Sequence, residues 1–329
     1  MSKSKIKTGI VGGAGYTGGE MLRLLVHHPD VEISFVHSRS NAGKQVSDIH
    51  TDLLGDTDLT FADKLKEDID VLFLCVGHGE AKKFLAENKI TSLTRIIDLS
   101  QDFRINANAT FEKREFIYGL PELNGEEIRS AQNIANPGCF ATAIQLALLP
   151  LAAKSLLSNS VHVTATTGST GAGQSLSNTS HFSWRQNNLS AYKVFTHQHL
   201  AEIYQSVHSL NAQNNGEILM IPLRGAFTRG IFATLYIECS LSETEAKDLF
   251  NNYYSKHPFV FVSNQNPDLK QVVNTNKCVL YIEKHDNQLM ITSIIDNLLK
   301  GASGQAVQNM NLMFGLEETA GLKLKASAF

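Results

Sequence analysis

Cysteine is scarce and scattered in this sequence of 329 residues, and no two cysteines are close enough to form a CxxC pair. The four are Cys75, Cys139, Cys239 and Cys278. Their spacing argues against a disulfide framework and against a metal site. Three of them lie within apolar, strand-like runs, where we expect them to be buried like small hydrophobic residues. Cys139 is the exception, because it follows the chain-breaking pair Pro137 and Gly138.

Long apolar runs and a large excess of charge are also missing. No run approaches the roughly 18 to 20 apolar residues that a membrane-spanning helix needs. The short polar stretch before Ile6 lacks the apolar core of a signal peptide. The formal net charge is only −3, so we expect neither nucleic acid nor an anionic membrane as a partner. These features indicate a cytoplasmic protein.

The first half of the chain alternates strand and helix patterns. Apolar runs predict strands at residues 6–11, 31–37, 70–76 and 95–99, and apolar residues at helical spacing predict helices at 16–26 and 80–88. This alternation, with short connections, is typical of a parallel sheet covered on both faces. It predicts an α/β domain with a doubly wound, Rossmann-type fold.

The pattern changes after Pro150, where strands become more frequent and helices fewer. Strands are predicted at residues 160–167, 217–222, 231–240, 278–284 and 289–295, and helices at 196–209, 243–257 and 302–314. The turn residues 285–287 favour a hairpin between the last two strands. We therefore expect a second, α+β domain with a mixed or antiparallel sheet. Residues 168–190 contain few apolar residues, and form either a flexible linker or an ordered active-site loop.

A glycine-rich turn follows the first predicted strand, with the spacing G-x-x-G-x-x-G. Glycines at such a turn let the backbone approach a pyrophosphate, which then binds at the start of the next helix. The position between a first strand and a helix predicts a dinucleotide site. A merely tight turn between strand and helix is the alternative. The expected cofactor-binding residues are Gly12, Gly15, Tyr16, Thr17 and Gly18.

The end of the second predicted strand indicates which dinucleotide is bound. An NAD site would place Asp or Glu there to hold the ribose 2′-hydroxyl. This chain has Ser38, Arg39 and Ser40 instead. An arginine flanked by hydroxyl groups suits a 2′-phosphate, because arginine binds phosphate bidentately. The sequence therefore favours NADP over NAD.

Cys139 lies at or near the first turn of a predicted helix. The positive end of a helix lowers a thiol pKa and favours the reactive thiolate, and its N–H groups can stabilise an oxyanion. The alternative is a cysteine packed against the sheet. His197 and His199 could share one pocket if their segment is extended, and one of them would then accept the thiol proton. Arg104 follows the end of a predicted strand of the first domain, and Arg229 precedes a predicted strand of the second. Either arginine could hold a carboxylate or phosphate.

Five segments, in this order, resemble those of the N-acetyl-γ-glutamyl-phosphate reductase family, and together they extend over nearly the whole chain. They are Gly9–Gly18, Asp98–Arg104, Tyr118–Asn124, Ala135–Cys139 and Ser293–Leu316. The resemblance implies an NADP-dependent reductase of arginine biosynthesis, with a thioester intermediate on Cys139 and assistance from His199 or His197. It also implies a homodimer or homotetramer.

The resemblance carries expectations for the domains and for further site residues. It implies an NADP-binding domain of residues 1–138 and 301–329, and a catalytic and oligomerisation domain of residues 139–300. It places Asn297, Lys300 and Gly301 near the cofactor. We expect the substrate to contact Arg104, Asn136, Gly168 and Arg229.

Several alternatives remain open from the sequence. Family members often carry a histidine and a second proline where this chain has Leu223 and Ala226, so the substrate is N-acetyl- or N-succinyl-γ-glutamyl phosphate. A related acyl-phosphate reductase, such as aspartate-semialdehyde dehydrogenase, would use the same chemistry on a smaller substrate. A non-catalytic NADP-sensing protein would keep the dinucleotide fold without turnover. A cysteine hydrolase would leave the glycine turn unexplained.

Overall fold

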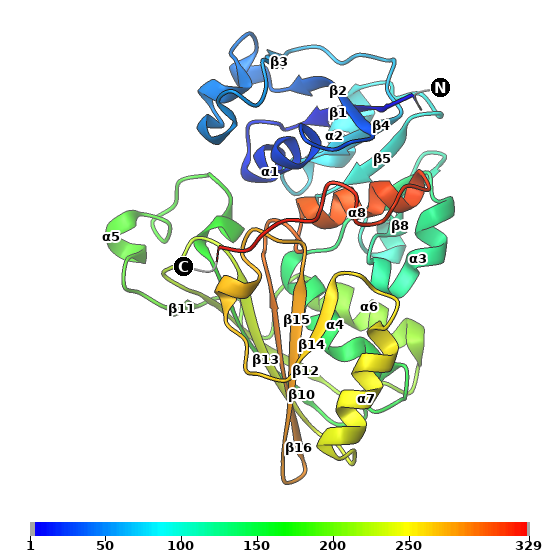
Figure 1. Cartoon of the computed structure of the whole chain (residues 1–329), viewed down its shortest axis with the longest axis vertical. Coiled ribbons are helices and arrows are strands. Elements are labelled where there is room, and N and C mark those ends of the chain that lie inside the picture. The colour runs from blue at the N-terminus through cyan, green and yellow to red at the C-terminus, as the bar shows by residue number, and fades with distance from the viewer. Residues whose placement is uncertain (1–3, 328–329) are drawn as a thin grey trace. The chain divides into compact units, whose positions relative to one another are not determined.

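The computed structural model describes residues 4–327, which divide into two compact units (Figure 1). The first unit comprises the chain up to Pro137 together with Ala302–Lys323, and the second comprises Gly138–Gly301 together with the residues from Leu324. In the described part of the chain, no helix combines the length and apolar character needed to cross a membrane.

The first unit is built on a seven-stranded parallel sheet. The strand order is β3-β2-β1-β4-β5-β9-β8, and every neighbouring pair is parallel. The strands are β1 (Ile6–Val11), β2 (Val31–His37), β3 (Phe61–Ala62), β4 (Val71–Leu74), β5 (Arg95–Asp98), β8 (Ile117–Tyr118) and β9 (Asn133–Ala135). The small hairpin beside the sheet consists of β6 (Thr110–Phe111) and β7 (Arg114–Glu115). The predicted doubly wound parallel sheet is confirmed.

Four α-helices of the described chain belong to this unit, three from the N-terminal part of the chain and one from near its C-terminus. They are α1 (Tyr16–Leu25), α2 (Glu80–Glu87), α3 (Pro121–Ser130) and α8 (Ser303–Met313). Helix α2 buries Ala81, Phe84 and Leu85 in a cluster with strand residues such as Phe35 and Leu72. The orange-red helix α8 packs against both α1 and α3 (Figure 1). A segment near the C-terminus thus completes the core of the N-terminal unit.

The second unit contains a seven-stranded mixed sheet of order β11-β12-β10-β13-β16-β15-β14. Its strands are β10 (Val161–Thr167), β11 (Ser190–Ala191), β12 (Ile218–Arg224), β13 (Ile231–Glu238), β14 (Val260–Ser263), β15 (Cys278–His285) and β16 (Gln288–Ile295). Strands β15 and β16 form the predicted antiparallel hairpin, with Asp286 at a φ of +51° in its turn. The sheet also contains the parallel pairs β10–β12 and β14–β15. The predicted mixed sheet is confirmed.

The central helix of this unit is α4 (Cys139–Ala152), which the chain buries on every side. Every residue of the helix after Cys139 is buried, because the sequence is apolar around the whole helix. It packs against β13, β15 and β16 and against α6 (His199–Leu210), with α7 (Glu243–Tyr254) also in contact. The Ser293 hydroxyl donates to the Ala143 carbonyl at 2.7 Å, and the Tyr254 hydroxyl to the Leu146 carbonyl at 2.6 Å. Cys139 therefore starts a helix that is fixed by the core.

The segment of residues 168–190 is an ordered loop rather than a flexible linker. It contains the short helix α5 (Phe182–Arg185) and a 3₁₀ turn at Ser169–Ala172. Arg185 is buried, and it donates to the Arg224 carbonyl at 2.7 Å and to the Thr179 carbonyl at 3.1 Å. One buried guanidinium thus ties the loop to the end of β12.

The segment after Lys323, which we expected in the first domain, forms its hydrogen bonds within the second unit. The Ser327 backbone N–H donates to the Val273 carbonyl at 3.2 Å. The Asn274 side-chain amide donates to the Ser327 hydroxyl at 2.7 Å. The chain therefore returns to the second unit after α8.

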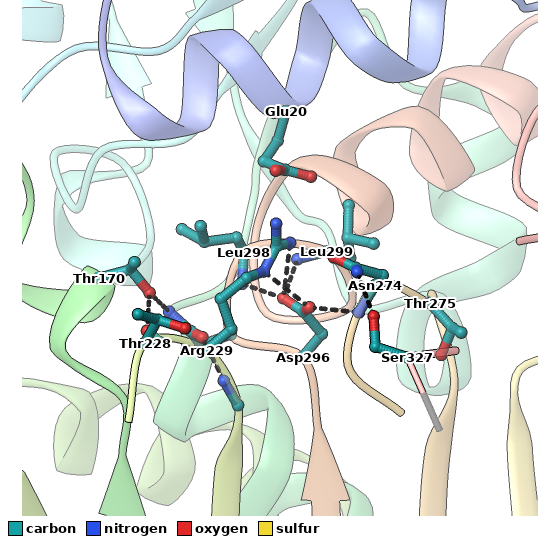
Figure 2. Close-up of polar contacts among 12 residues, drawn as sticks. Glu20, Thr170, Thr228, Arg229, Asn274, Thr275, Asp296, Leu298, Leu299 and Ser327 are labelled. Atoms are coloured by element: carbon teal, nitrogen blue, oxygen red, sulfur yellow. Dashed lines mark hydrogen bonds and ion pairs between the residues drawn. The ribbon is translucent and has the colours of Figure 1, made fainter. Parts of the chain in front are cut away.

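A buried carboxylate, Asp296, organises the segment that follows β16 (Figure 2). The Arg229 guanidinium donates to both of its oxygens, from Nε at 3.0 Å and from Nη2 at 3.1 Å. Backbone N–H groups of Asn274, Leu298 and Leu299 donate to it at 2.7, 2.8 and 3.1 Å. Asp296 has no exposed surface, so its charge depends on these partners.

Substitution of Asp296 by asparagine is expected to lower the free energy of unfolding by roughly 3–5 kcal/mol, because Arg229 would keep a largely buried charge without its counter-ion. Urea unfolding followed by tryptophan fluorescence and circular dichroism measures the change. Glu243→Gln is the matched control, since it removes one partner of the Glu243–Lys247 ion pair at the surface, where solvent screening leaves little contribution to stability. Equal losses in the two variants would contradict a central role for Asp296.

Candidate active site

The glycine turn after β1 has no room for side chains at two positions. Gly12 has a φ of +78°, and a Cβ there would lie 2.3 Å from the Cys75 carbonyl oxygen. A Cβ on Gly18 would lie 2.5 Å from the Gly12 carbonyl oxygen. The turn therefore requires glycine for close packing of strand, turn and helix. In the sheet order, β1 lies between β2 and β4, where a doubly wound sheet changes direction and ligands bind.

Helix α1 begins directly after this turn. Its N-cap is Gly15, and its first residues are Tyr16, which is 39% exposed, and Thr17. The leading N–H groups of an α-helix have no intrahelical partners and attract anions. The predicted cofactor-binding residues of this segment thus lie together at one helix start, as a pyrophosphate site requires. Their contact with the cofactor stays a prediction.

A surface depression of about 330 Å³ adjoins the same turn. Its lining includes Gly12, Ser38, Arg39 and Ser40 from the end of β1 and from the segment after β2, together with Lys83 from α2. Arg39 is exposed, and its guanidinium lies 3.6 Å from the Glu87 carboxylate. The residues predicted for the 2′-phosphate therefore share one depression. Lys83 is a second cation there, which the sequence analysis missed because only the fold brings α2 beside β2.

Cys139 is the first residue of α4 and is half-buried, whereas Cys75, Cys239 and Cys278 are buried. Gly138 is the N-cap, and its carbonyl accepts the Thr142 N–H at 2.8 Å as the helix begins. The first turn of α4 contains no acidic residue, and the carboxylate at this helix end comes from Glu202 of α6, which accepts the Gly138 N–H. The predicted position of Cys139 is confirmed, and it favours the thiolate.

His199 packs directly against the residue before the cysteine. A Cβ on Gly138 would lie 2.3 Å from the His199 Nε2 atom, so glycine is needed for the ring to approach. Glu202, one turn further along α6, accepts the Gly138 N–H at 2.9 Å, and its other oxygen lies 3.9 Å from the His199 Nε2. A buried carboxylate beside a histidine orients the ring and stabilises its protonated form. The i,i+3 spacing in the predicted helix was the available signal for Glu202, which the sequence analysis missed.

His197 lies beside His199, with the ring centroids 4.6 Å apart. The segment is not extended as we expected, because Gln198 has helical backbone angles and α6 begins at His199 rather than at residue 196. The His199 backbone N–H donates to the His197 Nδ1 at 3.2 Å, so this nitrogen carries no proton. Burial, with smaller effects of Lys193 and Arg224, lowers the pKa of His197 to about 4. His197 is therefore a neutral ring at physiological pH.

Tyr192 and Arg224 complete the surroundings of the two histidines. The Tyr192 ring lies 5.8 Å from the His197 ring, and the Arg224 guanidinium carbon lies 4.7 Å from the centre of the Tyr192 ring. Burial raises the pKa of Tyr192 to about 12, Cys139 adds to this, and Arg224 opposes it. Neither residue had a sequence signal, because they meet only when the loop before α6 folds against the end of β12.

The two substrate-binding residues predicted in the first unit form hydrogen bonds with backbone carbonyls around them. Arg104 is buried, and it donates to the Asn136 carbonyl at 2.8 Å and to the Leu99 carbonyl at 2.9 Å. The Asn136 side chain donates to the Ala302 carbonyl at 3.1 Å and accepts from Asn309 at 3.1 Å. These bonds fix the carboxyl end of β5 and β9. A role of either residue in substrate binding stays a prediction.

The predicted residues of the second unit around Asp296 are also tightly packed. The Asn297 side chain accepts from the Gly230 N–H at 2.7 Å and donates to the Thr170 hydroxyl at 3.0 Å. A Cβ on Gly168 would lie 2.4 Å from the Thr228 carbonyl oxygen, and one on Gly301 would lie 2.8 Å from the Cys139 Cβ. Lys300 is fully buried. Gly301 therefore packs beside the cysteine. The contacts of Asn297, Lys300 and Gly301 with a cofactor stay predictions. The contacts of Gly168 and Arg229 with the substrate also stay predictions.

Comparison with known proteins decides the family. The sequence model described as the NAD-binding domain of semialdehyde dehydrogenase matches residues 7–131, and the one described as the semialdehyde dehydrogenase dimerisation domain matches residues 139–297. The N-acetyl-gamma-glutamyl-phosphate reductase of Flavobacterium johnsoniae is 57% identical over 98% of this chain and 100% of its own length. That of Azobacteroides pseudotrichonymphae is 58% identical with the same coverage. The chain belongs to the N-acetyl-gamma-glutamyl-phosphate reductase family.

Solved structures similar to this family member agree in fold at low sequence identity. Aspartate semialdehyde dehydrogenase II of Vibrio cholerae, in a complex with ASA, has a TM-score of 0.74 at 15% identity, covering 95% of this chain and 99% of that one. Aspartate semialdehyde dehydrogenase of Candida albicans, with NADP, has a TM-score of 0.68 at 12% identity, covering 94% and 99%. Both support the two-part architecture and, at this identity, nothing beyond the fold.

Proposed function

We propose that the protein reduces an N-acyl-γ-glutamyl phosphate to the N-acyl-glutamate semialdehyde with NADPH, releasing phosphate, as a step of arginine biosynthesis. The observation that carries the proposal is the half-buried Cys139 at the start of α4, with His199 packed on the preceding residue. The full-length similarity to N-acetyl-gamma-glutamyl-phosphate reductases supports the substrate class. Unit 1 carries the cofactor site in this proposal, and unit 2 carries the substrate chemistry.

Covalent catalysis divides the reaction into two steps. His199 accepts the Cys139 proton, and the thiolate then attacks the γ-carbonyl carbon. N–H groups at the start of α4 stabilise the tetrahedral oxyanion, which collapses when the bond to phosphate breaks. His199 returns its proton to the departing phosphate, and a thioester remains on Cys139. Glu202 keeps the histidine ring in place during both proton transfers.

The residues of unit 1 fit a phosphorylated dinucleotide. The turn whose glycines leave no space for a Cβ would lie against the pyrophosphate, while Ser38, Arg39 and Ser40 would hold the 2′-phosphate. The chemistry that bound NADPH supplies is a hydride to the thioester carbonyl. Collapse of the resulting thiohemiacetal breaks its C–S bond, releases the aldehyde and regenerates the Cys139 thiolate.

The protein is proposed to act as a homodimer or homotetramer in the cytoplasm. The match to a dimerisation domain supports an oligomer, as does the sheet face that exposes Tyr236 and Phe261 at 45% each while Ala233 and Leu235 on the other face are buried. None of the four cysteines, which all lie in the described part of the chain, forms a disulfide, which suits a reducing compartment.

The reaction run in reverse tests the proposed function. The enzyme is mixed with NADP⁺, inorganic phosphate and either N-acetyl- or N-succinylglutamate semialdehyde, and NADPH absorbance is followed. Turnover with at least one of the two is expected, and aspartate semialdehyde is expected to react poorly. Turnover only with aspartate semialdehyde favours the related dehydrogenase, and binding of NADP without any turnover favours a sensing protein.

Substitution of Arg39 by leucine is expected to lower the preference for NADPH over NADH by roughly 10- to 100-fold, the effect of losing charge-assisted hydrogen bonds to the 2′-phosphate. The measurement is kcat/KM for each dinucleotide. Arg129→Leu is the control, since Arg129 is an exposed arginine of the same unit that also lies near a glutamate, Glu126 at 3.8 Å. An unchanged ratio in the Arg39 variant would exclude it from the 2′-phosphate site.

A further inference from the structure

Three cations surround the side of the site formed by Tyr192 and His197, and they differ in what they bind. Arg185 donates to backbone carbonyls of Arg224 and Thr179, which holds its guanidinium in the loop. The Lys193 ammonium donates to the Gln198 side chain at 2.8 Å. Arg224 is the third, at the last position of β12.

Arg224 retains binding capacity that its surroundings do not use. Its Nε is buried, and within residues 4–327 it has no hydrogen-bond partner; no carboxylate of that range forms an ion pair with this guanidinium. Arg185 instead adds a second positive charge nearby. Burial, with a smaller effect of the Arg224 charge, lowers the pKa of Arg185. A half-buried guanidinium that is flanked by like charge and has no carboxylate partner gains by binding an anion.

The position of Arg224 fits the far end of a substrate whose reacting end lies at Cys139. The Arg224 guanidinium carbon lies 4.7 Å from the centre of the Tyr192 ring, and the centres of the Tyr192 and His197 rings are 5.8 Å apart. His197 in turn lies 5.3 Å from the ring of Phe140, the residue after the cysteine. Two rings thus lie between Arg224 and the residue after the cysteine, while a glutamyl chain carries its other charged groups several bonds from the attacked carbonyl.

We propose that Arg224 is a specificity-determining residue that binds a carboxylate of the substrate remote from the reacting acyl group. This inference rests on the proposed function for the identity of the substrate. The carboxylate is either the α-carboxylate of the glutamyl part or the terminal carboxylate of an N-succinyl group. The two share the same recognition chemistry, a bidentate contact with a guanidinium.

The test compares Arg224→Leu, Arg224→Lys and the wild type in the reverse reaction. KM and kcat are measured for N-acetyl- and N-succinylglutamate semialdehyde, and KM is measured for inorganic phosphate. Arg224→Leu is expected to raise the semialdehyde KM by roughly 10- to 100-fold, with a partial effect for Arg224→Lys, which keeps the charge but not the fork. Lys154→Met removes an exposed cation of the same unit and is the control.

The two sources of the carboxylate give different results. A rise with both semialdehydes identifies the α-carboxylate, whereas a rise with the N-succinyl compound alone identifies the acyl carboxylate. An unchanged KM for both, or a rise in the phosphate KM alone, overturns the proposal. Thermal unfolding of each variant separates a binding defect from misfolding.

A second readout separates this inference from the proposed function. N-acetylglutamate and N-succinylglutamate are tested as ligands that slow the alkylation of Cys139 by iodoacetamide, which needs no turnover. Protection in the wild type and its loss in Arg224→Leu support the carboxylate site even where the reverse reaction fails. Equal protection in both proteins, or protection in neither, counts against it.

Discussion

Replacement of Cys139 by serine is expected to lower kcat by at least roughly 10³-fold, as for other enzymes that lose their nucleophile. The positive end of a helix favours ionisation of a thiol, but the pKa of a serine hydroxyl is too high for the same helix end to ionise it. The side chains are similar in size, so the fold around Gly301 and α4 should persist. The measurement is kcat in both reaction directions, with thermal unfolding as the check on folding.

The other cysteines provide the control for this experiment. Cys239 is 9% exposed and lies just after β13, so Cys239→Ser should retain activity close to that of the wild type. Iodoacetamide followed by mass spectrometry should label Cys139 first, because the buried thiols react more slowly. A Cys139→Ser variant with wild-type kcat would rule out the thioester, while leaving the dinucleotide site unaffected.

Substitution of His199 by glutamine is expected to lower kcat by roughly 10²- to 10⁴-fold, the usual contribution of a general acid–base group. His199 packs on Gly138 and has the Glu202 carboxylate beside it, so it can hold the thiol proton until the phosphate departs. His197→Gln should have a smaller effect. Its pKa of about 4 leaves His197 uncharged at working pH, and its Nδ1 already accepts the His199 N–H.

The pH profile distinguishes the two histidines more sharply than the rates do. A group with a pKa lowered to about 4 does not change charge between roughly pH 5 and 8, so any step of kcat in that range should persist in His197→Gln. Such a step should disappear in His199→Gln, because His199 is the proposed general base. The reverse pattern, with the step lost only in His197→Gln, would exchange the roles of the two residues.

The sequence predicted those parts of the fold whose pattern is local. The predicted strands at residues 6–11 and 31–37 have the same bounds as β1 and β2, because apolar residues recur through both segments and glycine or polar residues follow them. Helix α3 was missed. It contains Gly125 and a non-helical Asn124, so it lacks a regular apolar pattern, and only Pro121 at its first turn marked it.

Residues of the site that depend on distant contacts were not predictable in the same way. Cys139 was identified because the adjacent residues Pro137 and Gly138 predict the start of its helix. Helix α6 lies between Tyr192 and the strand of Arg224 in the chain, and only the pairing of β11 with β12 brings the two residues together. His197 and His199 do meet, but through a helical turn at Gln198 rather than through the extended backbone we expected.

The all-round burial of α4 has a consequence for how the enzyme loses activity. A helix without a solvent-facing side has no low-energy route to local opening, so its amide hydrogens should exchange only when the second unit unfolds as a whole. The nucleophile belongs to the most protected part of that unit, while the loop that carries Tyr192 lies outside it. Under mild denaturation, substrate recognition should therefore fail before the cysteine loses its position at the helix end.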